Sequence, residues 1–446
     1  MTTTPDGVGA DVAVHAAERG GAGGDLLFVN AAQVVTCAGP ARARSGAEMR
    51  DAGVHEGWCV AVRGDTIAAV GPQPEIERAV AGATRVDCRG CIVTPGLVDS
   101  HTHAVFGAPR AGEHEMRAAG VGYMEIARRG GGIHASVRDA RERSEDELFA
   151  LARARLARLA SYGSTTVEVK SGYGLTVESE LKLLRVVQRL AEEGSGPRLV
   201  ATWLGAHEVP EEYRGSAASR ASYVKVLTAE MLPAVVQQQL ATFADVFCEP
   251  GVFSTDESRT ILRAARAAGL RLKLHADELE PAGGAELAAQ LGATSADHLA
   301  AISDSGIRAL AQSRTVATLL PGTMLFLGRT RHAPARALIE AGVPVALATD
   351  FNPGTSPTVN FPLILTLGVS QLHLSAAEVL IAATVNGAAA LDLADRVGQL
   401  TPGFSADLAV FEGHDYRELP YWYGDRRCKG TWVRGKACHP SDLPVL

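Results

Sequence analysis

The middle of the chain alternates between short apolar runs rich in β-branched residues and longer stretches with helical spacing of apolar residues. Typical helical stretches are SEDELFALARARLARLASYG over 144–163 and SRTILRAARAAGL over 258–270. Eight apolar runs have the length and composition of strands: CIVTPGLVDSHTH (91–103), TTVEVK (165–170), RLVATWLGAH (198–207), ADVFCEP (244–250), RLKLHADEL (271–279), ATSADHL (293–299), TVATLLPG (315–322) and VPVALATD (343–350). Because most of the eight are separated by helical stretches, the pattern predicts an α/β fold, a parallel (β/α)8 barrel of the TIM type.

An open, doubly wound sheet is the competing architecture for this alternation. Such sheets carry a glycine-rich phosphate-binding loop after their first strand. The first apolar run is instead followed by DSHTHAVFG over 99–107, which is not such a loop. We therefore expect the barrel.

The two ends of the chain share a different pattern, in which short β-type runs are broken by Gly, Asp and Pro. Residues 25–92 include WCVAVRGDTIAAVGP, and residues 400–446 include ADLAVFE and GTWVRGKACHP. Because termini often lie close together, we expect these two segments to form one small composite β-sandwich domain beside a barrel over 93–399. Residues 1–24 are expected to be a disordered tail.

Composition and charge exclude several classes of function. The formal net charge is −7, with no basic stripe of the kind that binds nucleic acid. No run reaches the roughly 18 apolar residues of a membrane span, and no secretory leader opens the chain, so we expect a cytoplasmic protein without a membrane partner. The seven scattered cysteines are expected to be reduced and mostly buried, and the single CxxC of Cys88 and Cys91 lacks a second pair that would form a zinc site.

Polar residues gather where the predicted barrel strands end. They are His101 and His103, His207, His275 with Glu278, His298, and Asp350. In a parallel barrel the carboxyl ends of all strands meet on the face that carries the active site. We therefore expect these side chains to converge.

Four of these residues form a candidate metal site. His101 and His103 are two residues apart, so an extended backbone directs both imidazoles to the same side. An isolated HxH is weak evidence, but His275 and Asp350 at two other strand ends complete a set that suits Zn²⁺ or Fe²⁺. The fourth run, DVFCEP, offers no lysine to bridge two metals, so a single ion is expected.

Two further residues are candidates for proton transfer. Glu278 lies three residues after His275, where its carboxylate can take a proton from water beside the metal. His298, on the next strand, is a candidate for orienting that water or sharing in proton transfer. A solvent-facing acid and a hydrogen-bonded core histidine are the alternatives.

These residues, with the motifs around them, resemble the amidohydrolase superfamily and, within it, the imidazolonepropionase family. The resemblance covers residues 26–435 and rests on TPGLVDSHTH, FGAPR, GGGI, VEVKSGYGL, LGAHEVP, KLHADEL, SADHL, LLPG and ATDFNPGTSP. The HxH and the terminal Asp are common to the superfamily. KSGYG and DFNPGTS together are much more specific.

The resemblance implies a role for each matching residue. His101, His103, His275 and Asp350 correspond to ligands of one zinc or iron ion, and Glu278 corresponds to an acid beside the substrate ring. Residues that correspond to substrate contacts are Arg110, Tyr173, His207, Asn352, Gly354 and Thr355. It also implies a homodimer. A guanidinium at Arg110 suits the propionate of 4-imidazolone-5-propanoate, because it can grip a carboxylate with two hydrogen bonds.

The function expected from this resemblance is hydrolytic opening of that ring to N-formimidoyl-L-glutamate, as in histidine degradation. Activated water attacks the ring carbonyl, His207 holds the ring or polarises the carbonyl, and Glu278, His298 and Asp350 remain unranked as proton-transfer groups. Another single-metal aminohydrolase acting on a purine or pyrimidine is the alternative enzyme. A non-catalytic barrel scaffold is the alternative from another class.

Overall fold

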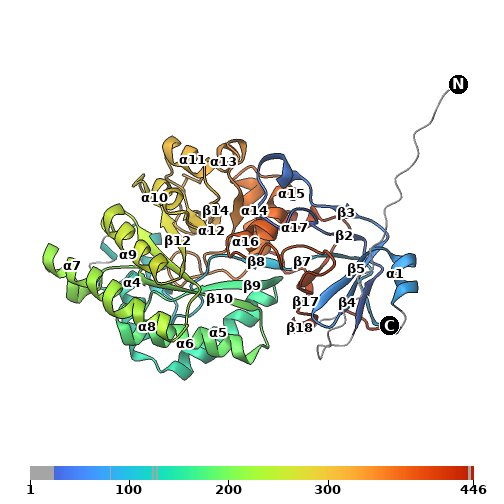
Figure 1. Cartoon of the computed structure of the whole chain (residues 1–446), viewed down its shortest axis with the longest axis horizontal. Coiled ribbons are helices and arrows are strands. Elements are labelled where there is room, and N and C mark those ends of the chain that lie inside the picture. Colours follow the sequence, from blue (N-terminus) through green and yellow to red (C-terminus); the bar gives the residue numbers. More distant parts are fainter. Residues whose placement is uncertain (1–24, 81, 123–124, 127–128, 440–442) are drawn as a thin grey trace.

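The computed structural model describes residues 25–80, 82–122, 125–126, 129–439 and 443–446 (Figure 1). The expected tail over 1–24 lies outside these residues. A large body of strands and helices occupies one side of the molecule, and a smaller group of strands from both chain ends lies beside it. The site described below belongs to the large body.

Eight parallel strands form the sheet of the large body, in an order that follows the chain from β8 to β15. They are β8 (Leu97–Asp99), β9 (Ser164–Lys170), β10 (Arg198–Ala206), β11 (Phe243–Cys248), β12 (Arg271–Ala276), β13 (Ser295–His298), β14 (Val316–Leu319) and β15 (Val345–Leu347). The segments after β8 and β15 meet, because His103 N–H donates to Phe351 O at 2.8 Å and Asp350 N–H donates to His101 O at 3.0 Å. The predicted (β/α)8 barrel is confirmed.

Helices surround this sheet. They are α2 (Ala111–Ala118), α4 (Ile133–Glu142), α5 (Glu145–Ala160), α6 (Val177–Glu193), α7 (Ala217–Val226), α8 (Leu232–Gln237), α9 (Thr255–Ala267), α10 (Gly284–Leu291), α11 (Asp304–Ala311), α12 (Pro321–Phe326), α13 (Ala335–Glu340), α14 (Phe361–Ser370), α15 (Ala376–Ala383) and α16 (Val385–Ala389). Local sequence fixes several of their starts. At α5, Ser144 Oγ accepts the N–H of Glu147 and the Glu147 carboxylate accepts the N–H of Ser144, which satisfies two donors that a helix start leaves free.

The smaller body contains two sheets. The first, β5-β4-β1-β6, consists of β1 (Leu26–Val29), β4 (Trp58–Arg63), β5 (Thr66–Pro72) and β6 (Thr84–Asp87), with α1 (Gln73–Ala79) after β5. The second, β18-β17-β16-β7-β2-β3, joins β2 (Gln33–Val35), β3 (Val54–His55) and β7 (Cys91–Pro95) to β16 (Leu408–Glu412), β17 (Cys428–Val433) and β18 (Lys436–His439); α17 (Glu418–Tyr421) follows β16.

Both chain ends contribute to this smaller body. Strand β16 pairs antiparallel with β7, so segments more than three hundred residues apart share one sheet. Phe28 of the first sheet and Trp432 of the second pack edge to face, with ring centroids 4.8 Å apart, and both lie in one buried cluster. The predicted composite β domain is confirmed.

The first apolar run divides between the two bodies, which its sequence did not indicate. Cys91–Pro95 forms β7 of the smaller body, and only Leu97–Asp99 forms β8 of the barrel. The expected boundary between residues 92 and 93 therefore falls within β7. The chain crosses from one body to the other at Gly96. A Cβ atom at this position would lie 2.0 Å from Thr165 Oγ1, so the crossing needs glycine. Both halves of the run are apolar, so the pattern alone does not separate them.

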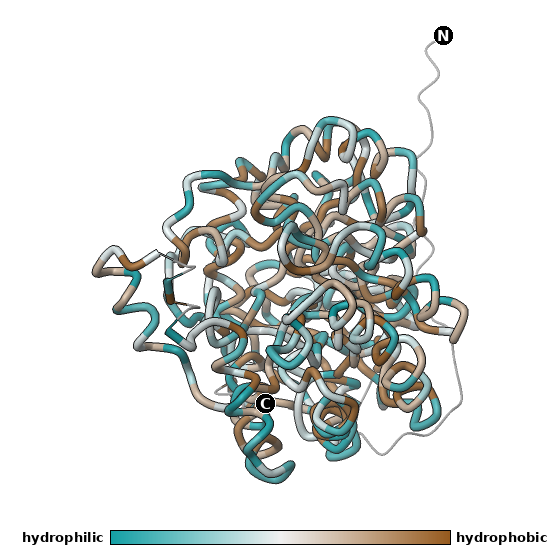
Figure 2. Tube along the Cα trace, turned by 90° about the vertical axis from the view of Figure 1, so that its left-hand side faces the viewer, coloured by the Kyte–Doolittle hydropathy of each residue, from teal (hydrophilic) through white to brown (hydrophobic). Residues whose placement is uncertain are grey.

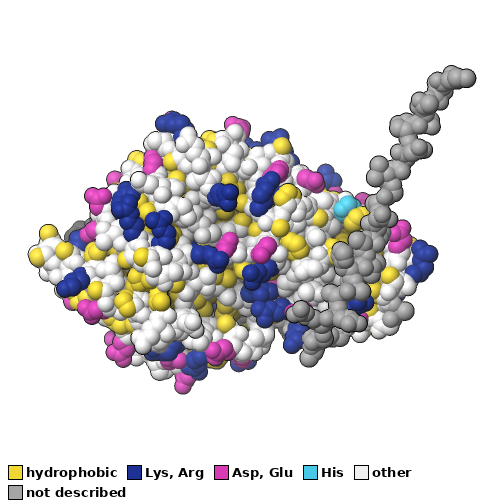
Figure 3. All heavy atoms as spheres, viewed as in Figure 1, with side chains coloured by type: hydrophobic (Ala, Val, Ile, Leu, Met, Phe, Trp, Pro, Cys, Tyr) yellow, Lys and Arg dark blue, Asp and Glu magenta, His cyan; other side chains and the backbone are white. Residues whose placement is uncertain are grey.

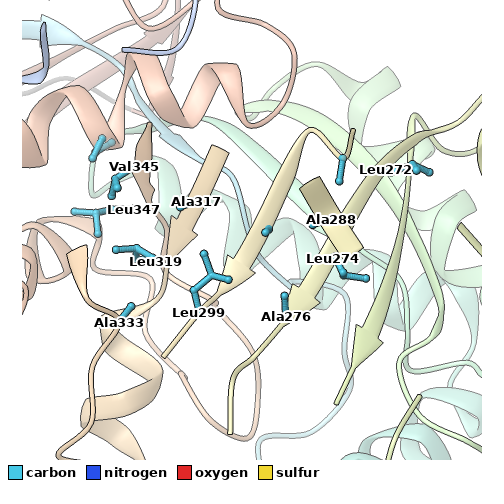
Figure 4. Packing of buried hydrophobic residues seen from close by; sticks show 14 of the residues in the cluster. Leu272, Leu274, Ala276, Ala288, Leu299, Ala317, Leu319, Ala333, Val345 and Leu347 are labelled. Carbon is cyan, nitrogen blue, oxygen red and sulfur yellow. The ribbon is translucent and has the colours of Figure 1, made fainter. Parts of the chain in front are cut away.

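Alternation along the barrel strands separates a hydrophobic outer face from a polar inner face. On β12, Leu272, Leu274 and Ala276 belong to the large buried cluster that also includes Ala288 of α10 (Figure 4). Between them on the same strand, Lys273 and His275 face the other way. The hydrophobic core thus lies between strands and helices, while the barrel interior is left for polar side chains. In Figure 2 hydrophobic segments run through the interior and many peripheral turns are hydrophilic.

The surface and the thiols agree with the composition. Lys and Arg are interspersed with Asp and Glu over the face drawn in Figure 3.

None of the helices in the described ranges has the length and apolarity of a membrane-spanning helix. All seven cysteines are free, and six of them are buried.

Candidate active site

Two histidines follow the first barrel strand and lie inside the barrel mouth. His101 is completely buried and His103 is 3% exposed, with their ring centroids 5.4 Å apart. The bridge between Thr102 and Phe351 holds their segment in line with the barrel sheet. The outward neighbour Thr102 donates its hydroxyl to Glu168 O at 2.6 Å, which leaves both imidazoles on the inner side.

His275 and Asp350 reach the same place from strands far along the chain. The ring centroids of His275 and His101 are 4.5 Å apart. Asp350 Oδ1 lies 3.5 Å from His101 Nε2 and 3.6 Å from His103 Nε2. The other carboxylate oxygen of Asp350 accepts the Thr323 hydroxyl at 2.6 Å, so the side chain has a fixed orientation.

The cluster fits a metal ion. Two overlapping groups bring their ligand atoms within 4.8 Å of one another: His101 with His103 and Asp350, and His101 with His275 and His298. The buried Nε2 atoms of His101 and His275 have no hydrogen-bond partner among the described residues. Buried polar atoms without partners are rare, and imidazole nitrogens beside a carboxylate are zinc or iron donors. The second group places His298 as near to the cluster as His275, so His298, expected at this face, also lies within reach as a ligand.

Electrostatics keeps the imidazoles of His101, His103 and His207 neutral. Burial, reinforced by neighbouring positive charge, holds the pKa of His101 and of His103 well below the usual histidine value. Burial also lowers the pKa of His207 to about 3 and raises the pKa of Asp350 to about 6. Neutral imidazoles have a free lone pair, which a metal ligand needs.

Two carboxylates behind the histidines were missed by the sequence analysis. Asp297 Oδ2 lies 2.6 Å from His101 Nδ1, and Asp245 Oδ2 lies 2.9 Å from His275 Nδ1. At His101 the carboxylate can only accept, so Nδ1 carries the proton and Nε2 presents its lone pair to the cluster. The contact of Asp245 with His275 Nδ1 is close but lacks hydrogen-bond geometry, and Asp245 accepts the backbone N–H of His275 at 3.1 Å. The available signal was position: Asp245 and Asp297 lie inside predicted strands, where an unpaired charge is costly.

Glu278 and His298 lie together at the edge of the cluster. His298 Nδ1 is 3.6 Å from Glu278 Oε2, and the Glu278 side chain is only 10% exposed. Burial, with Asp350 and Glu249 nearby, raises the pKa of Glu278 well above its usual value. The carboxylate of Glu249 fixes the loop, since it accepts the backbone N–H of Glu278 at 3.1 Å and that of Glu280 at 2.8 Å.

Tyr173 and His207 form one wall beside His103. The ring of His207 stacks on that of His103 at 5.0 Å, and the ring of Tyr173 lies 5.3 Å from that of His207. His207 Nδ1 is 2.9 Å from Gly172 O, so the ring and the loop that carries Tyr173 are tied together. Both side chains are buried, at 2% and 6% exposure, which places them in the site rather than on the surface.

Arg110 follows β8 and faces the loop after β15. Its Nε lies 3.7 Å from Glu113 Oε2, which is an ion pair but too long for a hydrogen bond. Both Nε and Nη1 are buried, and neither has a hydrogen-bond partner in the described structure. Among the causes that lower the pKa of His207, burial comes first, His275 second and Arg110 last. Buried guanidinium donors without acceptors are suited to an anionic ligand.

The NPGTS loop is held by its own asparagine. Asn352 Oδ1 accepts the N–H of Gly354 at 2.8 Å and of Thr355 at 2.7 Å, while its Nδ2 donates to Asp350 O at 2.7 Å. The same Nδ2 lies 2.9 Å from Thr355 Oγ1. The Asn352 side chain is therefore engaged inside the loop, and Gly354 is the loop residue against Arg110.

Comparison with known proteins covers almost the whole chain. The family model described as amidohydrolase family matches residues 107–439. An imidazolonepropionase of Geobacillus kaustophilus (strain HTA426) is 48% identical over 416 residues, covering 92% of this chain and 97% of that protein. The chain belongs to the amidohydrolase family, in its imidazolonepropionase branch. An imidazolonepropionase of Solibacter usitatus (strain Ellin6076) is 44% identical, with 93% and 99% of the two chains covered. The family resemblance of the motifs is confirmed.

Solved structures support the fold of this family member. An adenosine deaminase from Xanthomonas campestris with bound zinc has a TM-score of 0.69 at 20% identity, and covers 93% of this chain and 92% of its own. An atrazine chlorohydrolase from Arthrobacter aurescens TC1 complexed with zinc has a TM-score of 0.66 at 20% identity, over 94% and 96%. At such identity the likeness concerns the fold alone.

Proposed function

We propose that this amidohydrolase-family enzyme hydrolyses 4-imidazolone-5-propanoate to N-formimidoyl-L-glutamate. The observation that carries the proposal is that one loop, after β8, supplies both His101 and His103 of the candidate metal site and Arg110, a buried guanidinium whose Nε and Nη1 have no hydrogen-bond partner in the described structure. A hydrolase for a neutral base has no use for that guanidinium. The imidazolonepropionase relatives, which match nearly full length, support the same substrate.

The donor set suggests where the metal belongs. His101, His103, His275 and Asp350 would hold one zinc or iron ion, with His298 close enough to approach it. When bound, such an ion lowers the pKa of water and polarises a carbonyl oxygen. We propose a single ion, since the fourth barrel strand, β11, offers no lysine that could bridge two.

The protein side chains would orient the substrate. Arg110 would grip the propionate with two parallel hydrogen bonds, and Gly354 and Thr355 would line the space beside it. Tyr173 and His207 would hold the imidazolone ring against the metal cluster, because both lie beside His103. This places the ring carbonyl where water can reach it.

The reaction is a hydrolysis that balances with one water. Water adds to the ring carbonyl, the bond between that carbon and the ring nitrogen breaks, and the nitrogen takes up a proton. Glu278, His298 and Asp350 are the groups that would move protons. The raised pKa of Glu278 suits it to donate a proton to the leaving nitrogen.

A direct assay tests this proposal. The purified enzyme, loaded with zinc or iron, is given 4-imidazolone-5-propanoate, and the loss of its absorbance is followed; guanine and cytosine are tested in parallel for ammonia release. We expect turnover of the imidazolone alone. Ammonia from a base without turnover of the imidazolone would overturn the proposal in favour of a deaminase. A homodimer and a cytoplasmic location remain predictions from the sequence.

A further inference from the structure

A layer of charged side chains lies beneath the histidines, inside the barrel. Its members are at most 1% exposed: Glu168 and Lys170 on β9, Asp245 on β11, Lys273 on β12 and Asp297 on β13. Strand alternation explains the stacking, because Lys273 lies two residues before His275 on the same face of β12. None of these residues has a part in the proposed hydrolysis.

Lys170 is the member that contacts the most carboxylates. Its Nζ lies 2.7 Å from Glu168 Oε1, 2.8 Å from Asp245 Oδ2 and 3.7 Å from Asp297 Oδ2. Asp297 is the hydrogen-bond partner of His101 Nδ1, and Asp245 lies 2.9 Å from His275 Nδ1 and accepts the backbone N–H of His275. One ammonium group therefore connects the two carboxylates that lie behind these histidines.

Lys273 lies in the same layer but is connected differently. Its Nζ is 3.6 Å from Asp297 Oδ2 and 3.9 Å from Glu168 Oε1, and it donates to Ser100 O at 3.0 Å. It does not contact Asp245 within ion-pair distance in the described structure. Lys273 is therefore a matched control, equally buried but without the link between the two acceptors.

Two buried carboxylates this close to one another need a positive charge. Without it, the two negative charges repel one another, and a carboxylate that turns away no longer holds the Nδ1–H of its histidine. The imidazole is then free to adopt the other tautomer, whose proton sits on Nε2 and blocks the lone pair that faces the cluster. The presence of Lys170 prevents both changes.

We propose that Lys170 is a positioning residue of the metal centre: it holds the carboxylates of Asp245 and Asp297 against the Nδ1 atoms of His275 and His101, and so fixes the tautomers of the two rings. This inference rests on the proposed function only in taking those two histidines as ligands. Lys170 itself touches neither substrate nor reacting atoms. Its effect is to set the affinity of the site for its ion.

The test compares Lys170→Met with Lys273→Met in the full chain. Zinc affinity is measured by competition with a chromophoric chelator, and far-UV circular dichroism reports folding. We expect zinc to bind about 10- to 100-fold more weakly to folded Lys170→Met, the usual loss for an outer-layer partner, and a clearly smaller loss in Lys273→Met, which gives up the contact with Asp297 but leaves that with Asp245. Wild-type affinity in folded Lys170→Met, or an equal loss in both variants, would overturn the proposal.

A measurement on the unmodified protein covers the case in which Lys170→Met does not fold. Metal-free protein labelled with ¹⁵N in histidine reports the tautomer of each ring by NMR, with His101→Gln and His275→Gln used for assignment. We expect the Nδ1–H tautomer at both positions, and the Nε2–H tautomer at either one contradicts the proposal. Neither experiment uses turnover, so failure of the proposed function is seen separately, in the imidazolone assay.

Discussion

Gly354 lies directly against the guanidinium of Arg110: a Cβ atom at Gly354 would stand 1.1 Å from Arg110 Nη2. Because the loop that carries Gly354 is fixed by Asn352, the arginine rather than the loop must move when that space is filled. The contact therefore couples the loop after β15 to the residue that we expect to bind the substrate carboxylate. It is testable with a single methyl group.

We predict that Gly354→Ala displaces Arg110 and raises KM for the propionate substrate at least about tenfold, while the metal stays bound. A displaced charge-assisted hydrogen bond is worth about 1.5–3 kcal/mol, which corresponds to roughly that range or more. Steady-state kinetics and metal analysis measure the two quantities. Gly112→Ala is the control, because its added Cβ meets no atom within 4 Å. An unchanged KM in Gly354→Ala would show that substrate binding does not depend on the position of Arg110.

Removal of the guanidinium itself should have the same effect without a steric change. For Arg110→Ala we expect KM to rise about 10- to 100-fold with zinc or iron content unchanged, since Arg110 contacts none of the four candidate ligands. Arg89→Ala, whose side chain is 78% exposed on the small domain, serves as the surface control. Full activity of Arg110→Ala on the propionate substrate would refute the carboxylate grip.

His275→Ala is expected to abolish metal retention and turnover together, because it removes one of the buried imidazole donors of the candidate metal site. Elemental analysis after gel filtration and the imidazolone assay are the readouts. The exposed His414→Ala is the matched control. Wild-type protein freed of metal by a chelator should also unfold at lower temperature, and a hundredfold excess of ion over Kd should restore about 2.7 kcal/mol of stability. Metal retained at full occupancy in His275→Ala would contradict the ligand assignment.

Glu180 should be essential to the loop that carries Tyr173. It is fully buried on α6, and its carboxylate accepts the backbone N–H groups of Gly172, Gly174 and Leu175 at 2.7–3.1 Å. Glu180→Ala would leave three buried donors without an acceptor, so we expect a loss of about 3 kcal/mol or more in the free energy of unfolding. Urea unfolding measures it, and the exposed Glu178→Ala on the same helix should change stability by less than about 1 kcal/mol. A similar small change in both variants would refute this role.

The thiols should be unreactive in the native protein. Burial raises the pKa of Cys37, Cys59 and Cys428 to about 12, and that of Cys248 to about 11, so these groups stay protonated at pH 8. We expect almost no reaction with a disulfide reagent between pH 7 and pH 9, and reaction of all seven cysteines after denaturation. Rapid reaction of native Cys88 or Cys91 would instead favour a redox function for the CxxC.

Much of this protein follows from its sequence. The alternation of strand and helix patterns predicts the barrel, and the β-type ends predict the composite domain, because periodicity and turn residues are local properties of the chain. The ends of the strands also indicate His101, His103, His275 and Asp350, since parallel strands bring their carboxyl ends to one face whatever lies between them.

Other features depend on contacts between distant segments and could not be predicted in this way. Only the tertiary structure shows that Asp245 and Asp297 stand behind the histidines and that Lys170 links them. These pairings depend on the register and tilt of neighbouring strands, which an apolar pattern does not encode. The crossing at Gly96 is similar, because both halves of that run are equally apolar. The sequence therefore determined which residues face the site, and the packing of strands against one another decided how each is held.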